Sequence, residues 1–303
     1  MKDSTVLTFT GDIGFDHFME NRWEDDELVA KEILDVMRAS DHVIINVEGP
    51  LIDSASAKLV SAREMRLMHT IDPAAVLVFD RLKADVWNLC NNHIMDAGEA
   101  GLRASLDEAK RAGVRTLGVG MNVTEAARPV IFDEAGGIGM FAVGYQRGCK
   151  PAGEDKGGCL NWAELDVIGD TINEIKKTCR WCIIVSHGGE EFTSLPSPYT
   201  RDRYLKYLDM GADIIVCHHP HVPMNYEIIS GSGYAGDDGG CDKTGEERKK
   251  KAIFYSLGNF IFDTPYQRAQ YNTEKGIVLS LSLDEDDFGF KAYGIRIDRE
   301  SER

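Results

Sequence analysis

Short apolar runs rich in Val, Ile and Phe alternate with amphipathic segments along most of the chain, and this alternation limits the folds available to it. The stretches "TVLTFTGD", "HVIINVEGPL" and "WCIIVSHGGEE" have the β-branched and aromatic composition of buried strands. Between such runs, segments such as 26–40 and 98–114 carry apolar residues at helical spacing. The repeated strand–helix order, followed by a mostly β end, predicts an α/β fold. A mixed sheet or a two-sheet sandwich covered by helices satisfies it best.

Local signals predict where helices begin and end. Asp72 is a plausible N-cap with Pro73 at the first helical position, and Gly113 is a C-terminal signal. Further helices are predicted around 163–178 and at 200–210. No segment is long enough to be a domain linker, so residues 1–303 are predicted to form a single domain. Residues 230–251 are rich in Gly, Asp and Lys and predict a loop or hairpin insertion.

Charge and hydrophobicity exclude some partners. The 303 residues are 43% hydrophobic, enough to bury a large core, and the formal net charge is −16. A nucleic-acid-binding protein normally needs a basic face, so no nucleic-acid partner is expected. The negative balance also disfavours binding to anionic membrane surfaces.

The N-terminal sequence and the cysteines suggest a compartment. The sequence shows no signal-peptide pattern and no apolar run long enough to predict a transmembrane segment. Seven cysteines, an odd number, suggest reduced thiols and a cytoplasmic protein. If a leader had been removed, the protein would instead be extracellular or membrane-associated. Cys179 and Cys182 form a C-x-x-C best explained as ordinary buried cysteines, and Cys149 and Cys159 flank a Gly-rich loop in which they could approach each other.

Metal-ligating residue types follow most of the predicted strands. Parallel strands of an α/β fold place ligands at their carboxyl ends, so the residue after each apolar run is informative. These positions hold Asp12, Glu48, Asn92 with His93, His187, and the "HHPH" of residues 218–221. Turn chemistry explains a single Asp or Asn at a strand end, but not histidine at three of them.

The composition of this set predicts a two-metal hydrolytic site. Imidazole suits zinc and iron, and carboxylate suits manganese as well; a carboxylate can also bridge two cations. His219 and His221 are two residues apart, so extended backbone would direct both side chains to one face, and Pro220 favours that conformation at His219. The expected cofactors are two divalent ions, Mn, Zn or Fe, with an activated water between them.

Each piece also has an ordinary explanation when taken alone. Asp12 could be a turn residue, Glu48 a solvated carboxylate, and His187 a hydrogen-bonded structural histidine. Asn91 or Asn92 could cap the turn into the next helix. Taken alone, "HHPH" is as consistent with a polar turn as with a metal site. Their joint placement at strand ends favours the metal site.

The ordered motifs "GD", "NVEGPL", "NLCNNHIMDAG", "SHGGEEF", "HPHV" and "YSLGNF" resemble the poly-γ-glutamate capsule-synthesis protein family, which looks like a branch of the calcineurin-like metallophosphoesterases. The resemblance spans roughly residues 5–265. It implies a four-layer αββα sandwich with two mixed β-sheets flanked by helices and a two-metal site between the sheets. It also implies metal-dependent hydrolysis, in which a metal-bound hydroxide attacks phosphorus or a carbonyl carbon.

The resemblance also implies roles for individual residues. Asp12 and His221 would serve one metal, Asn92, His187 and His219 would serve the other, and Glu48 would bridge them. His93 matches the histidine that protonates the leaving oxygen, a role suited to its near-neutral pKa. Glu191 and Asn259 would either contact the metal-binding side chains without binding the metal themselves, or contact substrate.

Three positions depart from the wider pattern or fall outside it. Metallophosphoesterases open with Asp-x-His, but Gly14 stands two residues after Asp12, and His17 is a candidate replacement. The family's "HWG" is "HGG" here, so Gly188 replaces an aromatic residue and is expected to open or reshape one wall of the site. His218 receives no role and is expected to face solvent.

Three functions remain as hypotheses. The leading one is a metallophosphoesterase-type hydrolase, with a small molecule or polymer as substrate, either a phosphoester or poly-γ-glutamate. The second is an accessory role in poly-γ-glutamate synthesis or export, and without a P-loop the chain is not by itself an ATP-driven ligase. The third is a degenerate, non-catalytic binding subunit, which the missing Asp-x-His ligand favours.

Overall fold

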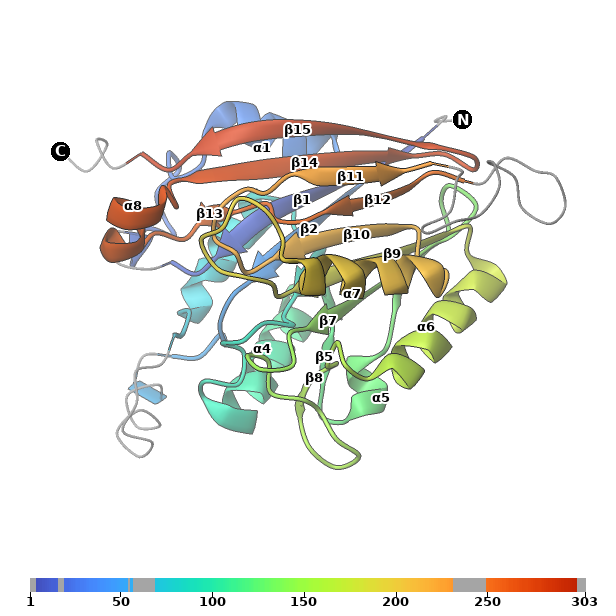
Figure 1. Ribbon diagram of the computed structural model, residues 1–303. Coiled ribbons are helices and arrows are strands. Elements are labelled where there is room, and N and C mark those ends of the chain that lie inside the picture. The colour runs from blue at the N-terminus through green and yellow to red at the C-terminus, as the bar shows by residue number, and fades with distance from the viewer. Residues whose placement is uncertain (1–3, 16–18, 54, 57–68, 231–248, 299–303) are drawn as a thin grey trace, which may run out of the picture.

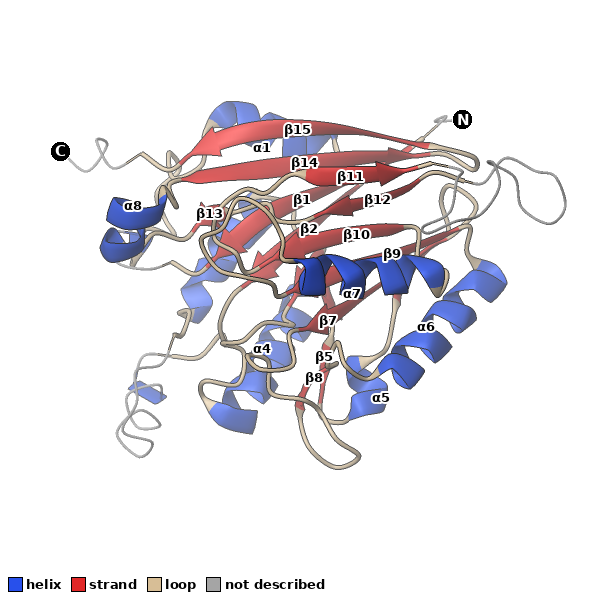
Figure 2. Cartoon of the chain, viewed as in Figure 1, coloured by secondary structure: helices blue, strands red, loops and turns tan. Residues whose placement is uncertain are grey.

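The chain forms two large mixed β-sheets accompanied by helices, as Figure 1 and Figure 2 show. The computed structural model describes residues 4–15, 19–53, 55–56, 69–230 and 249–298. Within these ranges a third, two-stranded sheet pairs β5 (Val119–Gly120) with β8 (Gly158–Cys159). The α/β class predicted from the sequence is therefore confirmed.

The first large sheet is parallel at its centre and antiparallel at one edge. Within the described ranges it has seven strands, in the order β15-β14-β1-β2-β3-β4, with β13 pairing to β1. Strands β1 to β4 and β13 are parallel, β14 pairs antiparallel with β1, and β15 pairs antiparallel with β14. The strands are β1 (Thr5–Ile13), β2 (His42–Val47), β3 (Val86–Asn88), β4 (Arg115–Leu117), β13 (Asn259–Ile261), β14 (Lys275–Leu283) and β15 (Phe288–Arg296).

The second large sheet is also mixed. Within the described part of the chain it has six strands, in the order β11-β12-β10-β9-β7-β6, parallel from β12 to β7 and antiparallel at both edges. The strands are β6 (Val130–Phe132), β7 (Ile138–Gly144), β9 (Trp181–His187), β10 (Ile214–His218), β11 (Tyr226–Ile229) and β12 (Lys251–Phe254).

The helices begin and end largely where the sequence predicts. The Asp72 side chain accepts a hydrogen bond from the backbone N of Ala74, and Gly113 closes its helix with φ +71°. Ser197 caps the helix that was predicted at 200–210, which begins at Pro198. The helices are α1 (Lys31–Ala39), α3 (Val76–Arg81, after a 3-10 turn Pro73–Ala75), α4 (Gly98–Ala112), α5 (Val123–Ala126), α6 (Leu165–Thr178), α7 (Pro198–Asp209) and α8 (Pro265–Tyr271).

The alternating side chains of β9 show how the second sheet is covered. Ile183 and Val185 belong to the same apolar core as Phe9 of the first sheet. Ile184, between them, belongs to a separate core that includes Ile172 of α6 and other residues of α6 and α7. One face of the second sheet therefore packs toward the first sheet and the other against helices, which lie in front of the strands in Figure 1.

The polar residues at the strand ends of the two large sheets gather in one region. The residues singled out in the sequence lie at or shortly after the carboxyl ends of the parallel strands β1, β2 and β3, and likewise of β9 and β10. Because carboxyl ends of parallel strands share an edge, these residues meet there. The predicted insertion at 230–251 lies mostly outside the described residues, as does His17. No helix among the described residues is long and apolar enough to cross a membrane.

Candidate metal centre

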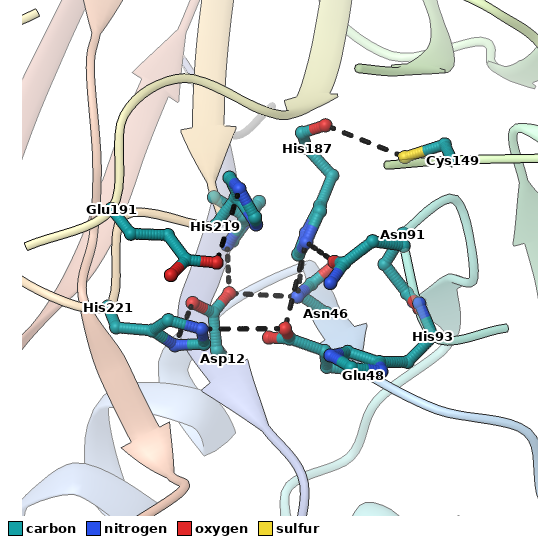
Figure 3. Close-up of polar contacts among 12 residues, drawn as sticks. Asp12, Asn46, Glu48, Asn91, His93, Cys149, His187, Glu191, His219 and His221 are labelled. Atoms are coloured by element: carbon teal, nitrogen blue, oxygen red, sulfur yellow. Dashed lines mark hydrogen bonds and ion pairs between the residues drawn. The ribbon is translucent and has the colours of Figure 1, made fainter. Parts of the chain in front are cut away.

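Two groups of buried acidic and histidine side chains meet where the strands end. One group is Glu48, His187 and His219, and the other is Asp12, Glu48 and His221. Within each group the candidate ligand atoms lie within 4.8 Å of one another, and Figure 3 shows these side chains pointing toward a common centre. Either group has the composition to hold a metal ion, and Glu48 belongs to both.

The distances within the groups are wider than hydrogen bonds. Nε2 of His187 and Nε2 of His221 each lie 3.7 Å from Oε1 of Glu48, and Nδ1 of His221 lies 3.5 Å from Oδ2 of Asp12. Ligand atoms about 2.1 Å from one shared ion stand roughly 3.0–3.5 Å apart. Among the described residues, no group donates a hydrogen bond to the buried Oδ2 of Asp12. The donor set and this acceptor therefore fit a cation.

Burial keeps two of the imidazoles neutral. Burial lowers the pKa of His187 well below its usual value, and the neighbouring histidines lower it further. Burial likewise lowers the pKa of His219 to about 3, with the charge of His221 adding to the effect. A histidine binds a metal only in its unprotonated form, so both rings are in the form that can bind a metal at neutral pH.

Asp12 lies within a buried polar network that the sequence does not reveal. The strand register places Asp12 beside Asn46 of β2. Nδ2 of Asn46 donates to Oδ1 of Asp12 at 2.8 Å, and Asn88 donates in turn to Asn46 at 2.7 Å. Asn46 stands two residues before Glu48. In extended backbone this spacing directs both side chains to the same face, and it is the one sequence signal that could have pointed to Asn46.

His218 corrects a prediction, because it does not face solvent. Its side chain is 2% exposed, and its Nδ1 lies 3.3 Å from Oδ1 of Asp12. Burial alone would raise the pKa of Asp12, but the hydrogen bond and charge of His218, with the charge of His221, lower it below the usual value. His218 is the last residue of β10, a strand buried on both faces, so its side chain enters the molecule.

The backbone between the next two histidines also differs from the prediction. His219 has φ +98° and His221 φ +58°, so neither is extended, despite the bias that Pro220 imposes. An extended pair would direct both rings to one face, whereas here His219 belongs to one group and His221 to the other. Positive φ at a non-glycine residue costs of order 1–3 kcal/mol and is characteristic of functional sites.

The "NNH" turn after β3 separates three roles. Oδ1 of Asn91 accepts hydrogen bonds from the backbone N of His93 and of Ile94, at 3.1 and 2.8 Å, which confirms the capping alternative for Asn91. Oδ1 of Asn92 lies 2.8 Å from Nε2 of His187, next to the first group. Nδ1 of His93 lies 2.9 Å from Oδ2 of Asp96, a partner that sequence reasoning missed although it belongs to the same motif.

The remaining predicted residues border the site. Oδ1 of Asn259 lies 2.9 Å from Nδ1 of His221, so Asn259 orients that ring with Nε2 toward Glu48. Oε1 of Glu191 lies 3.7 Å from Nε2 of His219, and its side chain is half-exposed. The structure thus gathers Asp12, Glu48, His187, His219 and His221, with Asn92, Asn259 and Glu191 beside them.

Gly188 does not open a wall of the site. A Cβ built on Gly188 would lie 2.7 Å from Cβ of Tyr145 and 3.1 Å from Cζ3 of Trp162. These two rings contact each other edge-on, with centroids 4.7 Å apart. The wall is therefore reshaped, because aromatic side chains from elsewhere in the chain occupy the space next to Gly188.

Replacing Gly188 by Ala is therefore expected to destabilise the protein by about 1–3 kcal/mol, because the added methyl group overpacks this contact. Chemical denaturation of the purified variant would measure the loss. Gly289→Ala is the matched control, since a Cβ there meets nothing within 4 Å. Equal stability of the two variants would contradict the packing argument.

Cysteine side chains lie around and behind this region. The six described cysteines are free and buried, including Cys179 and Cys182. Sγ of Cys149 lies 3.8 Å from the carbonyl oxygen of His187, and Sγ of Cys159 lies 3.6 Å from that of Asn91.

Comparison with known proteins gives a family for this arrangement. The family described as "Bacterial capsule synthesis protein PGA_cap" matches residues 6–264. The chain belongs to this family. The match covers all five residues of the two acid–histidine groups, and so confirms the resemblance of the sequence motifs to capsule-synthesis proteins.

Curated relatives of this family member have related names. The "PGA biosynthesis protein CapA" of Bacillus subtilis is 28% identical over 274 residues, covering 88% of this chain. The "Capsule biosynthesis protein CapA" of Bacillus anthracis is 25% identical over 278 residues, also covering 88%. A "Probable polyglutamine synthesis accessory protein" of Mycobacterium tuberculosis is 23% identical over 214 residues, covering 64%. The matched regions span 66%, 62% and 53% of these relatives, respectively.

Proposed function

We propose that this chain is a metal-dependent hydrolase of the metallophosphoesterase type that acts in poly-γ-glutamate capsule synthesis. The single observation that carries the hydrolase proposal is the pair of buried acid–histidine groups that share Glu48. One carboxylate common to two groups is the arrangement a two-metal site needs. We extend the proposal to the fold, as a single domain with the αββα layering of metallophosphoesterases.

The proposed ligand sets follow the two groups. Asp12 and His221 would hold one divalent ion, His187, His219 and Asn92 would hold the other, and Glu48 would bridge them. The ions would be Mn, Zn or Fe, all compatible with mixed imidazole and oxygen ligands. When bound, such a pair supplies an activated water and a positive field for the oxygens of a phosphoryl group.

Other residues of the chain would orient the ligands and protonate the leaving group. Asn259 fixes the ring of His221, and the Asn46 amide fixes Asp12, so both proposed ligands are pre-oriented. His93 would protonate the leaving oxygen, and Asp96 would hold its ring through Nδ1. This hydrogen bond leaves Nε2 of His93 as the atom that carries the transferred proton.

The capsule role is supported by the family and by the printed names of the relatives. Those names refer to capsule or PGA biosynthesis, and this chain spans no more than about two thirds of their length. The substrate we propose is accordingly a phosphoester or the poly-γ-glutamate polymer itself. The acidic surface of the chain would repel a polyanion unless bound metal offset the repulsion.

A second candidate is an accessory or non-catalytic binding subunit of the same pathway. Gly14 favours it, because the usual second ligand of the first motif has no counterpart at this position. This candidate predicts weak or missing metal binding in the group of Asp12.

Metal content and turnover together test the proposal. Protein stripped with a chelator and incubated with Mn²⁺ or Zn²⁺ is expected to regain between one and two ions per chain and to hydrolyse bis-p-nitrophenyl phosphate. The chelated protein is the control and should be inactive. If elemental analysis finds no ion regained, the binding subunit is the better hypothesis.

A further inference from the structure

His69 is a sixth histidine next to the candidate metal centre, and no motif pointed to it. Its ring lies over the two glycines that follow the proposed ligands of β1 and β2. A Cβ on Gly14 would lie 2.7 Å from Nε2 of His69, and a Cβ on Gly49 would lie 3.0 Å from its Cδ2. Gly49 also has φ +141°, a conformation that favours glycine. The absence of side chains at both positions therefore makes room for His69.

The backbone holds His69 next to the segment that carries Glu48. Ile71 donates a backbone hydrogen bond to the carbonyl oxygen of Pro50 at 3.0 Å, and Ile52 donates to that of Ile71 at 3.0 Å. The backbone N of His69 itself donates to Oδ2 of Asp96 at 3.0 Å. These bonds tie His69 to both the Glu48 turn and the "NNH" motif.

The ring of His69 packs directly against His93. The two ring centroids are 4.9 Å apart. His69 also stacks on Phe262, with ring centroids 5.2 Å apart, and the centroid of Phe262 in turn lies 4.7 Å from that of His221. Oδ2 of Asp96 contacts both Nδ1 of His93 and the backbone N of His69. His93 is thus held by a carboxylate at one nitrogen and by a tilted ring contact with His69.

From this geometry we infer that His69 is a positioning residue that fixes the imidazole of His93 for proton transfer to the leaving oxygen. His69 belongs to neither acid–histidine group, so its effect reaches the reaction through His93 and not through metal ligation. The inference rests on the proposed hydrolase function. It also explains why position 14 is a glycine, because a side chain there would displace the His69 ring that holds His93.

The dependence of turnover on the leaving group tests this role. In metal-loaded His69→Ala, kcat for a phenyl phosphodiester should fall roughly 10–100-fold, since a misplaced acid loses much of its effect. The loss should be much smaller for bis-p-nitrophenyl phosphate, whose leaving group needs little protonation. KM and metal content should not change. A role in folding alone would lower both rates equally, and that result would overturn the inference.

A second measurement needs no turnover. In metal-free protein, the imidazole ¹H–¹³C signal of His93, assigned with His93→Gln, should shift in His69→Ala and also in His69→Gln, which keeps most of the side-chain volume. The matched control is His42→Gln, whose ring packs on Phe132 at the start of β2. An unchanged His93 signal in both His69 variants would overturn the inference. A shifted signal in a protein without hydrolase activity would sustain the positioning role and reject only the proposed function.

Discussion

Glu48→Gln is expected to abolish metal binding in both groups and to lower phosphodiester turnover by about 10³-fold or more, since bound metal contributes several kcal/mol of transition-state stabilisation. The physical reason is that one buried carboxylate serves both groups, with Nε2 of His187 and Nε2 of His221 each 3.7 Å from the same oxygen. An amide of equal size keeps the packing but loses the negative charge that a second cation would need. Elemental analysis after reloading, together with initial rates, measures both effects.

Glu125→Gln is the matched control for this prediction. It makes the same chemical change on α5, where Glu125 accepts a hydrogen bond from the backbone N of Met121 and takes no part in the site. Metal content and turnover should stay at the wild-type level. Unfolding curves of both variants would show whether the fold is intact. Normal binding of two ions by Glu48→Gln would contradict the shared-carboxylate arrangement.

The sequence predicted the candidate ligand positions because the topology of parallel strands is simple. Apolar runs identified the strands, and carboxyl ends of parallel strands converge, so the residues after each run meet. Asp12, Glu48 and His187 were found by this argument, and the structure brings them to one region. The helix signals at Asp72 and Gly113 worked for a different reason, because they depend on local hydrogen bonding alone.

The predictions of conformation and exposure for the residues of the "HHPH" turn were wrong because both depend on contacts between distant segments. The side chain of His218 enters the interior because it shares the face of β10 with Ile214 and Val216, which pack in the same core as Phe9 of the first sheet, and no local pattern states this. The positive φ values of His219 and His221 arise because two rings must reach different groups from one short turn. Local preference at Pro220 predicted the opposite, and tertiary geometry overrode it.

Gly14 and Gly188, the two glycines that the sequence motifs singled out, lie in similar surroundings. Next to Gly14 the space is filled by His69 and Phe262, and next to Gly188 it is filled by Tyr145 and Trp162. In both places rings from distant segments occupy the space that a side chain would need. Such packing cannot be read from one sequence, because it requires knowing which distant residues face each glycine.

His93→Ala is expected to lower kcat by about 10²–10⁴-fold, the contribution typical of a general acid. Metal content should be unchanged, because His93 belongs to neither acid–histidine group. Asp96→Asn should cause a smaller loss in the same direction, since it removes the carboxylate that holds Nδ1 at 2.9 Å but leaves the imidazole in place. Elemental analysis and steady-state rates on a phenyl and a p-nitrophenyl phosphodiester would measure both variants.

The leaving group separates proton donation from a structural effect of His93. Without an acid, the leaving group must depart as an unprotonated anion. The kcat of His93→Ala should therefore fall far more for the phenyl substrate than for the p-nitrophenyl substrate. His42→Ala is the control, because His42 pairs with Asp85 at the opposite end of β2 from Glu48 and should keep both rates. Equal losses on the two substrates in His93→Ala, or a parallel loss of bound metal, would assign His93 to metal binding or folding and not to proton transfer.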